Sequence, residues 1–230
     1  NVATIGESSS YSWRLYPEYT TKLDNVAKEH GVTITGTGAQ DFGMVHLGIL
    51  LSGACHKIDK IMYRSYFDAT NFGKETLAAL SKSPSMYTTF WDNIASSLNL
   101  TILNVEEIIG QNGTKINVTT DQGIEMVGEY TFTTEEEQSS GIKEFKEWEI
   151  QGEPNLQVKV NGLGSPVVTS AQMANRIPHI IHAPPGYVTI EKLPILKYLP
   201  GDISLCKNFA DGSPFGGYKQ SGNGREGGTW

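Results

Sequence analysis

Glu7 is the residue of this sequence whose type and setting best suit acid–base chemistry. It lies in a short loop, residues 6–10, that follows a strand-like start and precedes the aromatic residues Tyr11, Trp13 and Tyr16. A carboxylate beside aromatic side chains is desolvated, so its pKa rises, which suits a general acid or base or an anchor for an ammonium group. A solvated carboxylate on a surface loop is the alternative reading.

Two further groups of side chains could line a site. An apolar pocket could be walled by aromatic residues, although a plain core uses the same residue types. The candidates are Phe42, Tyr66, Phe67 and Phe72. His179 and His182 lie three residues apart on an expected helix, near Asn175 and Arg176. No third ligand stands at useful spacing, so we expect hydrogen-bonded or pocket-lining histidines and no metal.

Residues 32–54 would position these groups, because they predict a short strand, a glycine turn at Gly36-Thr37-Gly38 and a long apolar helix. Asp41 is placed to cap that helix, whose free N–H groups would offer a ligand site. Glycines at 43, 48 and 53 predict a close approach to its backbone. A dinucleotide motif is a poor match, because the third glycine comes too late and no acidic residue follows at the expected spacing.

The rest of the chain predicts an α+β fold: an open, mainly antiparallel sheet with helices on one face. Apolar periodicity and turn residues place helices at 17–30, 71–80, 84–98 and 169–183, the last capped by Thr169 or Ser170. Strands are expected at 60–68, 101–109, 115–119, 124–133, 142–150 and 156–160, with Asn112-Gly113 in one turn. Residues 187–203 are expected to be irregular and 211–230 to form a glycine-rich tail. The free face of the sheet needs a cover, so we expect a homodimer.

Composition and charge exclude some classes of function for this chain. The chain has 230 residues and a net charge of −7, which argues against nucleic acid as the main partner. No apolar run is long enough to span a membrane, and no signal peptide is recognisable. Cys55 and Cys206 show no paired pattern, which favours free thiols and a cytoplasmic location. The chain starts without Met on a strand-like segment, so we expect that an N-terminal part precedes it.

Several stretches of the sequence resemble the dihydrodipicolinate-reductase-like family, which includes 2,4-diaminopentanoate dehydrogenase and the native NAD(P)-dependent amine dehydrogenases. The matching stretches are Asn1-Val-Ala-Thr-Ile-Gly-Glu7, Tyr11-Ser-Trp13, Gly36-Thr-Gly-Ala-Gln-Asp41, Gly53-Ala-Cys55, Arg64-Ser65, Asn71-Phe-Gly73, Asn175-Arg-Ile-Pro-His179 and Ala183-Pro-Pro-Gly186. The resemblance runs from residue 1 to about 205 and corresponds to the portion after the family's Rossmann domain.

This resemblance implies domain limits and roles. Residues 1–35 would be the end of a nucleotide-binding domain, 36–205 a substrate-binding and dimerisation domain, and 206–230 a tail. Glu7 would bind the amine and assist the chemistry. Phe42, Phe67, Phe72 and His179 would line the substrate pocket, and Asn175 would contact the cofactor. The implied reaction interconverts an amine or diamine with a ketone plus ammonia, using NAD or NADP.

The last residues resemble a different family. Residues 213–226, Ser-Pro-Phe-Gly-Gly-Tyr-Lys-Gln-Ser-Gly-Asn-Gly-Arg-Glu, are similar to the C-terminal motif of aldehyde dehydrogenases, without that family's catalytic context around Cys206. We interpret them as a graft, fusion or frameshift product. Two alternatives to the amine dehydrogenase portion stay open: a non-catalytic amine-binding or dimerisation module, and an aldehyde dehydrogenase remnant.

Overall fold

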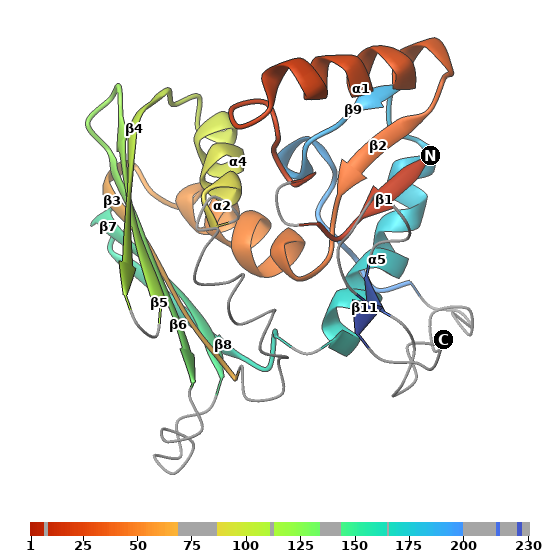
Figure 1. The fold of residues 1–230 in the computed structure, drawn as a ribbon. Helices are drawn as coiled ribbons and strands as arrows, with labels where there is room; N and C mark the ends of the chain where they lie inside the picture. Colours follow the sequence, from red (N-terminus) through yellow and green to blue (C-terminus); the bar gives the residue numbers. More distant parts are fainter. Residues whose placement is uncertain are drawn as a thin grey trace.

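The protein is described by a computed structural model that covers residues 1–6, 9–68, 87–110, 113–133, 144–164 and 166–199, together with the pairs 215–216 and 225–226. The two main sheets, of six and three strands, lie side by side, with helices packed between and around them (Figure 1), and β10 (Phe215–Gly216) pairs with β11 (Arg225–Glu226). Among these residues, no helix is long and apolar enough to cross a membrane. Cys55 is a free thiol, and Cys206 lies outside the described residues.

The larger sheet has six strands in the order β4-β5-β6-β3-β7-β8. Their bounds are β3 Lys57–Asp68, β4 Ile102–Gly110, β5 Gly113–Thr120, β6 Glu125–Thr133, β7 Phe145–Glu153 and β8 Leu156–Asn161. All neighbours pair antiparallel except β3 and β6, which are parallel. The α+β fold with a mainly antiparallel sheet is therefore confirmed, while the insertion of β3 at the centre was not foreseen.

One face of this sheet packs against helices α2 (Leu47–Ser52) and α4 (Thr89–Ser97) (Figure 1). An aromatic core of Tyr63, Phe90, Trp91, Tyr130 and Trp148 fills the interface. Period-2 alternation along β5 buries Ile116 and Val118 on the same face. The rings meet tilted or edge to face, as aromatic quadrupoles favour; Tyr63 and Trp148, for example, have centroids 4.8 Å apart.

The smaller sheet is parallel, with the order β1-β2-β9, and packs against α1 (Pro17–Glu29) and α5 (Pro166–Ile181). Its strands are β1 Val2–Thr4, β2 Thr33–Gly36 and β9 Gly186–Tyr187. The prediction that residues 187–203 are irregular was wrong at their start. There the Gly186 N–H donates to the Val32 carbonyl at 2.9 Å and begins the short strand β9.

The central helix differs from its prediction. It begins as a π-helical turn, η2 (Asp41–His46), and continues as α2, while Leu50 on its surface is 47% exposed. The expected close approach occurs at Gly48, where an added Cβ would lie 2.7 Å from Cη2 of Trp148. At Gly53 an added Cβ would be 3.5 Å from the nearest carbonyl oxygen, so that position needs no glycine on grounds of space.

Helix α5 also corrects a prediction. It begins at Pro166, and Thr169 and Ser170 therefore lie inside it, so neither is the cap. Proline suits the first turn of a helix because its fixed φ is helical and its missing N–H is not needed there. The predicted helix at 71–80, the Asn112 turn position and most of the tail lie outside the described residues.

Candidate functional site

The carboxyl ends of β1 and β2 define one edge of the parallel sheet. Thr4 and Gly36 are paired at these ends, and the Thr37 N–H donates to the Thr4 carbonyl at 2.9 Å. The segments that leave the two strands therefore start side by side. In open parallel sheets, ligands bind outside the carboxyl ends of the strands. This edge is the candidate site.

Backbone packing at this edge explains the glycine that ends β2. A Cβ added to Gly36 would lie 2.7 Å from Cα of Ser10, so the segment after β1 is pressed onto β2. Ser10 Oγ also donates to Thr89 Oγ1 at 3.0 Å, which links this segment to α4. Glu7 itself lies outside the described residues, whereas its described neighbours Gly6 and Ser9 are joined by a hydrogen bond from the Ser9 N–H to the Gly6 carbonyl.

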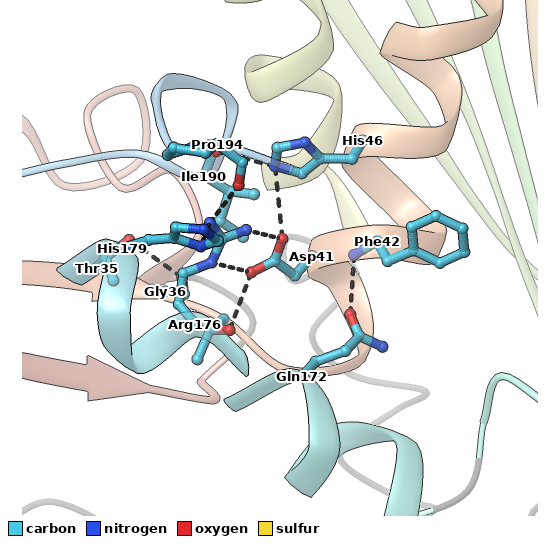
Figure 2. A network of polar contacts seen from close by, with 11 residues as sticks. Thr35, Gly36, Asp41, Phe42, His46, Gln172, Arg176, His179, Ile190 and Pro194 are labelled. Atoms are coloured by element: carbon cyan, nitrogen blue, oxygen red, sulfur yellow. Dashed lines mark hydrogen bonds and ion pairs between the residues drawn. The ribbon is translucent and has the colours of Figure 1, made fainter. Parts of the chain in front are cut away.

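A buried ion pair between Asp41 of η2 and Arg176 of α5 holds the opposite side of the turn (Figure 2). Arg176 Nε donates to Asp41 Oδ2 at 2.8 Å, and Nη2 donates to Oδ1. Thr37 Oγ1 donates to Asp41 Oδ2 at 3.0 Å, and Arg176 Nη1 donates to the Pro194 carbonyl at 2.6 Å. Both charged side chains are fully buried. Burial of such a pair is tolerated only with these additional hydrogen bonds.

Two histidines complete this network. His46 Nε2 lies 3.2 Å from the Ile190 carbonyl, to which it donates, and 3.5 Å from Asp41 Oδ1. Arg176 Nη1 donates to Nδ1 of His179 at 3.2 Å, so that nitrogen is unprotonated. The pKa of each histidine is lowered, chiefly by burial, and in both cases the charge of Arg176 adds to this effect. Burial therefore disfavours the charged form of both histidines.

The start of η2 is closed to an added ligand. The Asp41 N–H donates to the Gly38 carbonyl at 3.0 Å, and the Phe42 N–H donates to Gln172 Oε1 at 2.9 Å. A Cβ added to Gly38, where φ is +99°, would lie 3.2 Å from Ile5 and from Thr169. Asp41 makes no capping hydrogen bond to the helix, so the prediction of a capped, open helix start was wrong. The reason is that its carboxylate is occupied by Arg176.

The described residues among the predicted site residues have different neighbours. Phe42 follows Asp41, and in Figure 2 its ring points away from the ion pair. Phe67 on β3 packs against Phe132, with centroids 5.9 Å apart, and adjoins the aromatic core. Asn175 Oδ1 accepts a hydrogen bond from the Leu199 N–H at 3.2 Å. Phe72 lies outside the described residues.

His179 and His182 do not form a pair. His179 belongs to the ion-pair network, whereas His182 is exposed. Within the described ranges, no group of three His, Cys, Asp or Glu side chains could hold a metal ion.

Sequence reasoning missed Arg176 as the centre of the buried network beside the site. The sequence held one indication of its role. An arginine among the apolar residues of α5 would need an anionic partner if that face of the helix were buried. The partner, however, lies 135 residues earlier in the chain. His46 and Gln172 carried no signal, since their partners are a backbone carbonyl and a backbone N–H.

The structure defines the class of fold: an α+β domain with a mainly antiparallel sheet, similar to that of a known dehydrogenase. The amine dehydrogenase from Mycobacterium smegmatis is similar, with a TM-score of 0.77 and 28% sequence identity over 87% of this chain and 70% of that one. The 2,4-diaminopentanoate dehydrogenase of Acetoanaerobium sticklandii is 24% identical over 88% of this chain and 69% of its own length. These relatives point to an oxidoreductase of the amine dehydrogenase type.

Residues 106–208 match the family of 2,4-diaminopentanoate dehydrogenase C-terminal domains. The resemblance to the family of 2,4-diaminopentanoate and amine dehydrogenases, through its C-terminal portion, is thereby confirmed. The segment at 213–226 lies beyond the matched range, so its likeness to aldehyde dehydrogenases stays a prediction.

Proposed function

We propose that this protein is an NAD(P)-dependent amine dehydrogenase that interconverts an amine or diamine with a ketone plus ammonia. The observation that carries the proposal is its likeness to the M. smegmatis amine dehydrogenase over most of the chain. The candidate site agrees with it, because a substrate could lie at the carboxyl edge of the parallel sheet, where the loop with Glu7 begins.

In this proposal Glu7 holds the ammonium group or moves a proton on the nitrogen or on water. Phe42, Phe67 and Phe72 exclude water from the reacting carbon, since an apolar wall favours reaction in a dry pocket. The Asp41–Arg176 pair positions the segment from Thr37 to Phe42 without contacting substrate. The pair is fully buried and joined by two hydrogen bonds. It therefore fixes the backbone position from which the Phe42 side chain extends.

A dehydrogenase of this kind needs a hydride carrier, and we propose NAD or NADP. The Gly36–Gly38 turn does not fit its pyrophosphate. Ser10 packs on Gly36, Ile5 and Thr169 pack on Gly38, and the N–H groups of Asp41 and Phe42 already have acceptors. These residues therefore take no part in holding the cofactor. Asn175 stays a proposed cofactor contact that a coenzyme titration of the Asn175→Ala variant would test.

The test is a titration of the protein with NADH and NADPH, followed by reductive amination of a ketone panel with ammonia. Coenzyme binding with amine formation is expected. In the Glu7→Gln variant, turnover should fall by about 10² or more, because the proton can no longer be held or moved there. An unchanged rate would remove Glu7 from the mechanism. Amine binding without coenzyme binding would instead favour the non-catalytic amine-binding module.

We also propose that the protein forms a homodimer through the outer face of the six-stranded sheet. In the described part of the chain, no helix covers this face (Figure 1). It carries the half-buried Met62 and the buried Val127 together with an ion-pair cluster around Arg64, whose guanidinium lies within 3.5 Å of Glu129, Glu147 and Glu149. Sedimentation equilibrium should give twice the chain mass. A monomer at all concentrations would refute this assembly.

A further inference from the structure

The π-helical turn η2 begins the helix that carries Phe42. At its end the Leu47 N–H donates to the Phe42 carbonyl, five residues back along the chain. In an α-helix the same N–H would donate to the Gly43 carbonyl, four residues back. The π-turn therefore takes the α-helical donor away from Gly43. Turns of this kind are rare and are frequently found at functional sites.

The side chain of Trp148 on β7 supplies the missing donor. Its indole Nε1–H donates to the Gly43 carbonyl at 2.8 Å. The indole is fully buried, and its ring also lies against Gly48, where an added Cβ would be 2.7 Å from Cη2. A buried carbonyl without a donor costs free energy, so this hydrogen bond favours the π-turn over an α-helical turn.

Lys146 lies two residues before Trp148, on the same face of β7, and supports the start of the turn. Its Nζ donates to the Ala39 carbonyl at 3.5 Å, and its Cδ lies 3.2 Å from a Cβ added to Gly43. From α5, Gln172 Oε1 accepts the hydrogen bond of the Phe42 N–H. The backbone at Phe42 is thus held between β7 and α5, while Phe42 itself is half-buried and so partly open to a ligand.

We propose that Trp148 is a positioning residue that controls substrate specificity by directing the side chain of Phe42. This inference rests on the proposed function, in which Phe42 forms a wall of the substrate pocket. A π-turn holds one residue more than the α-helical turn it replaces, so its loss would rotate Phe42 by about 100° relative to the helix that follows. Trp148 would act through this turn and not by contact with substrate, because its side chain is fully buried.

Trp148→Phe and Trp91→Phe form a matched pair of variants. Both remove a fully buried indole of the same aromatic core, and both indoles contact the ring of Phe90. Trp91 differs because its Nε1 lies 3.0 Å from a Cβ added to Gly128 of β6, and it has no acceptor among the described residues. The two changes therefore remove the same volume, but only Trp148→Phe takes a hydrogen bond from η2.

The first measurement needs no enzymatic activity. Amide hydrogen exchange of the full chain would be followed by mass spectrometry in peptides that cover residues 42–47. In Trp148→Phe these amides should exchange about fivefold faster or more relative to peptides of β5, because one hydrogen bond of ordinary strength changes an equilibrium by about that factor. In Trp91→Phe the two sets of peptides should change together. Benzothienylalanine at position 148 keeps the bicyclic ring without the N–H and serves if Trp148→Phe does not fold.

The second measurement is the ratio of kcat/KM for the largest and the smallest ketone that the unaltered protein aminates, for example cyclohexanone and acetone. In Trp148→Phe this ratio should change about fivefold or more, because a displaced apolar wall alters the fit of a large substrate more than that of a small one. In Trp91→Phe the ratio should stay constant, even if lower stability reduces both values together.

Failure of the proposed function and failure of this inference give different results. If the unaltered chain aminates no ketone, the proposed function fails, and with it the role in specificity, whereas hydrogen exchange still decides whether Trp148 holds the π-turn. Equal exchange of residues 42–47 in the two variants would show that the indole N–H does not hold the turn. An unchanged ketone ratio in an active Trp148→Phe variant with faster exchange would show that the turn does not direct Phe42. Either result would overturn the inference.

Discussion

The aromatic core and the Asp41–Arg176 network are both buried, but different kinds of contact hold them together. In the aromatic core, Trp91, Tyr63 and Trp148 are fully buried and meet through ring contacts that need shape and little else. In the network, Asp41 and Arg176 are equally buried and meet through directed, charged hydrogen bonds. The first region joins the large sheet to its helices, and the second joins η2 to α5 beside the small sheet.

The difference shows why the second region is the better place for a site. Apolar packing tolerates substitution of similar volume, whereas a buried ion pair loses much of its stability when either partner is removed. Such a pair therefore fixes the position of nearby backbone more strictly. Here the backbone fixed is that of Thr37 to Phe42, beside the carboxyl edge of the parallel sheet.

The largest effect is expected from Asp41→Ala. The change leaves the Arg176 guanidinium buried and without its anion, which should lower the free energy of unfolding by about 3–5 kcal/mol. Urea denaturation would measure it. The double variant Asp41→Leu with Arg176→Met removes both charges and should recover most of the loss. A cost of less than about 1 kcal/mol for Asp41→Ala would show that the pair does not hold this region.

Gly48→Ala tests the aromatic core, where the fit between side chains determines stability. The new Cβ would lie 2.7 Å from Cη2 and 2.9 Å from Cζ3 of Trp148, whose ring is fully buried and cannot move aside. Overpacking of this kind costs about 1–3 kcal/mol, which exceeds the gain in helix propensity. Gly53→Ala, at the C-cap of the same helix and without a clash, is the control and should be nearly neutral. Equal effects of the two changes would contradict a packing origin.

The two regions also differ in how well the sequence predicts them. The strands of the large sheet were placed within a few residues, because alternation of apolar residues and turn residues are local signals. Burial of Phe90, Trp91 and Ile94 on α4 was likewise readable from helical spacing. The position of β3 between β6 and β7 was not, because that pairing joins segments far apart in sequence and no local pattern specifies it.

The candidate site was predictable only in part. The glycine turn at Gly36–Gly38 and the strand before it were foreseen, since positive φ and close packing require glycine. The role of Asp41 was misassigned, because local sequence favours a cap and the competing partner, Arg176, is distant. Two residues that are 135 positions apart produce no periodic pattern in the sequence that would reveal their ion pair.

His46 of the network should make stability depend on pH. Burial lowers its pKa below the usual value near 6.5, so the unfolded chain binds a proton at higher pH than the folded protein does. Stability should therefore decline as pH falls below about 6.5. His46→Gln should reduce this decline without abolishing it, because the pKa of His179 is also lowered. The measurement is the difference in urea midpoint between pH 7.5 and 5.5, and an identical decline in the variant would show that His46 is not buried in its neutral form.

The smallest effect is expected from Arg64→Gln on the outer face of the large sheet. Arg64 contacts three carboxylates, since Glu129, Glu147 and Glu149 all lie within 3.5 Å, whereas Arg176 is paired with one, that of Asp41. The Arg64 side chain is 31% exposed, however, so water and salt screen these pairs, and the monomer should lose only about 0–1 kcal/mol. Added salt should shrink that loss further in urea denaturation. If the proposed dimer buries this face, the same change should weaken association in sedimentation more than it weakens folding. A loss near that of Asp41→Ala, insensitive to salt, would mean that the number of ion pairs, and not their burial, decides their contribution.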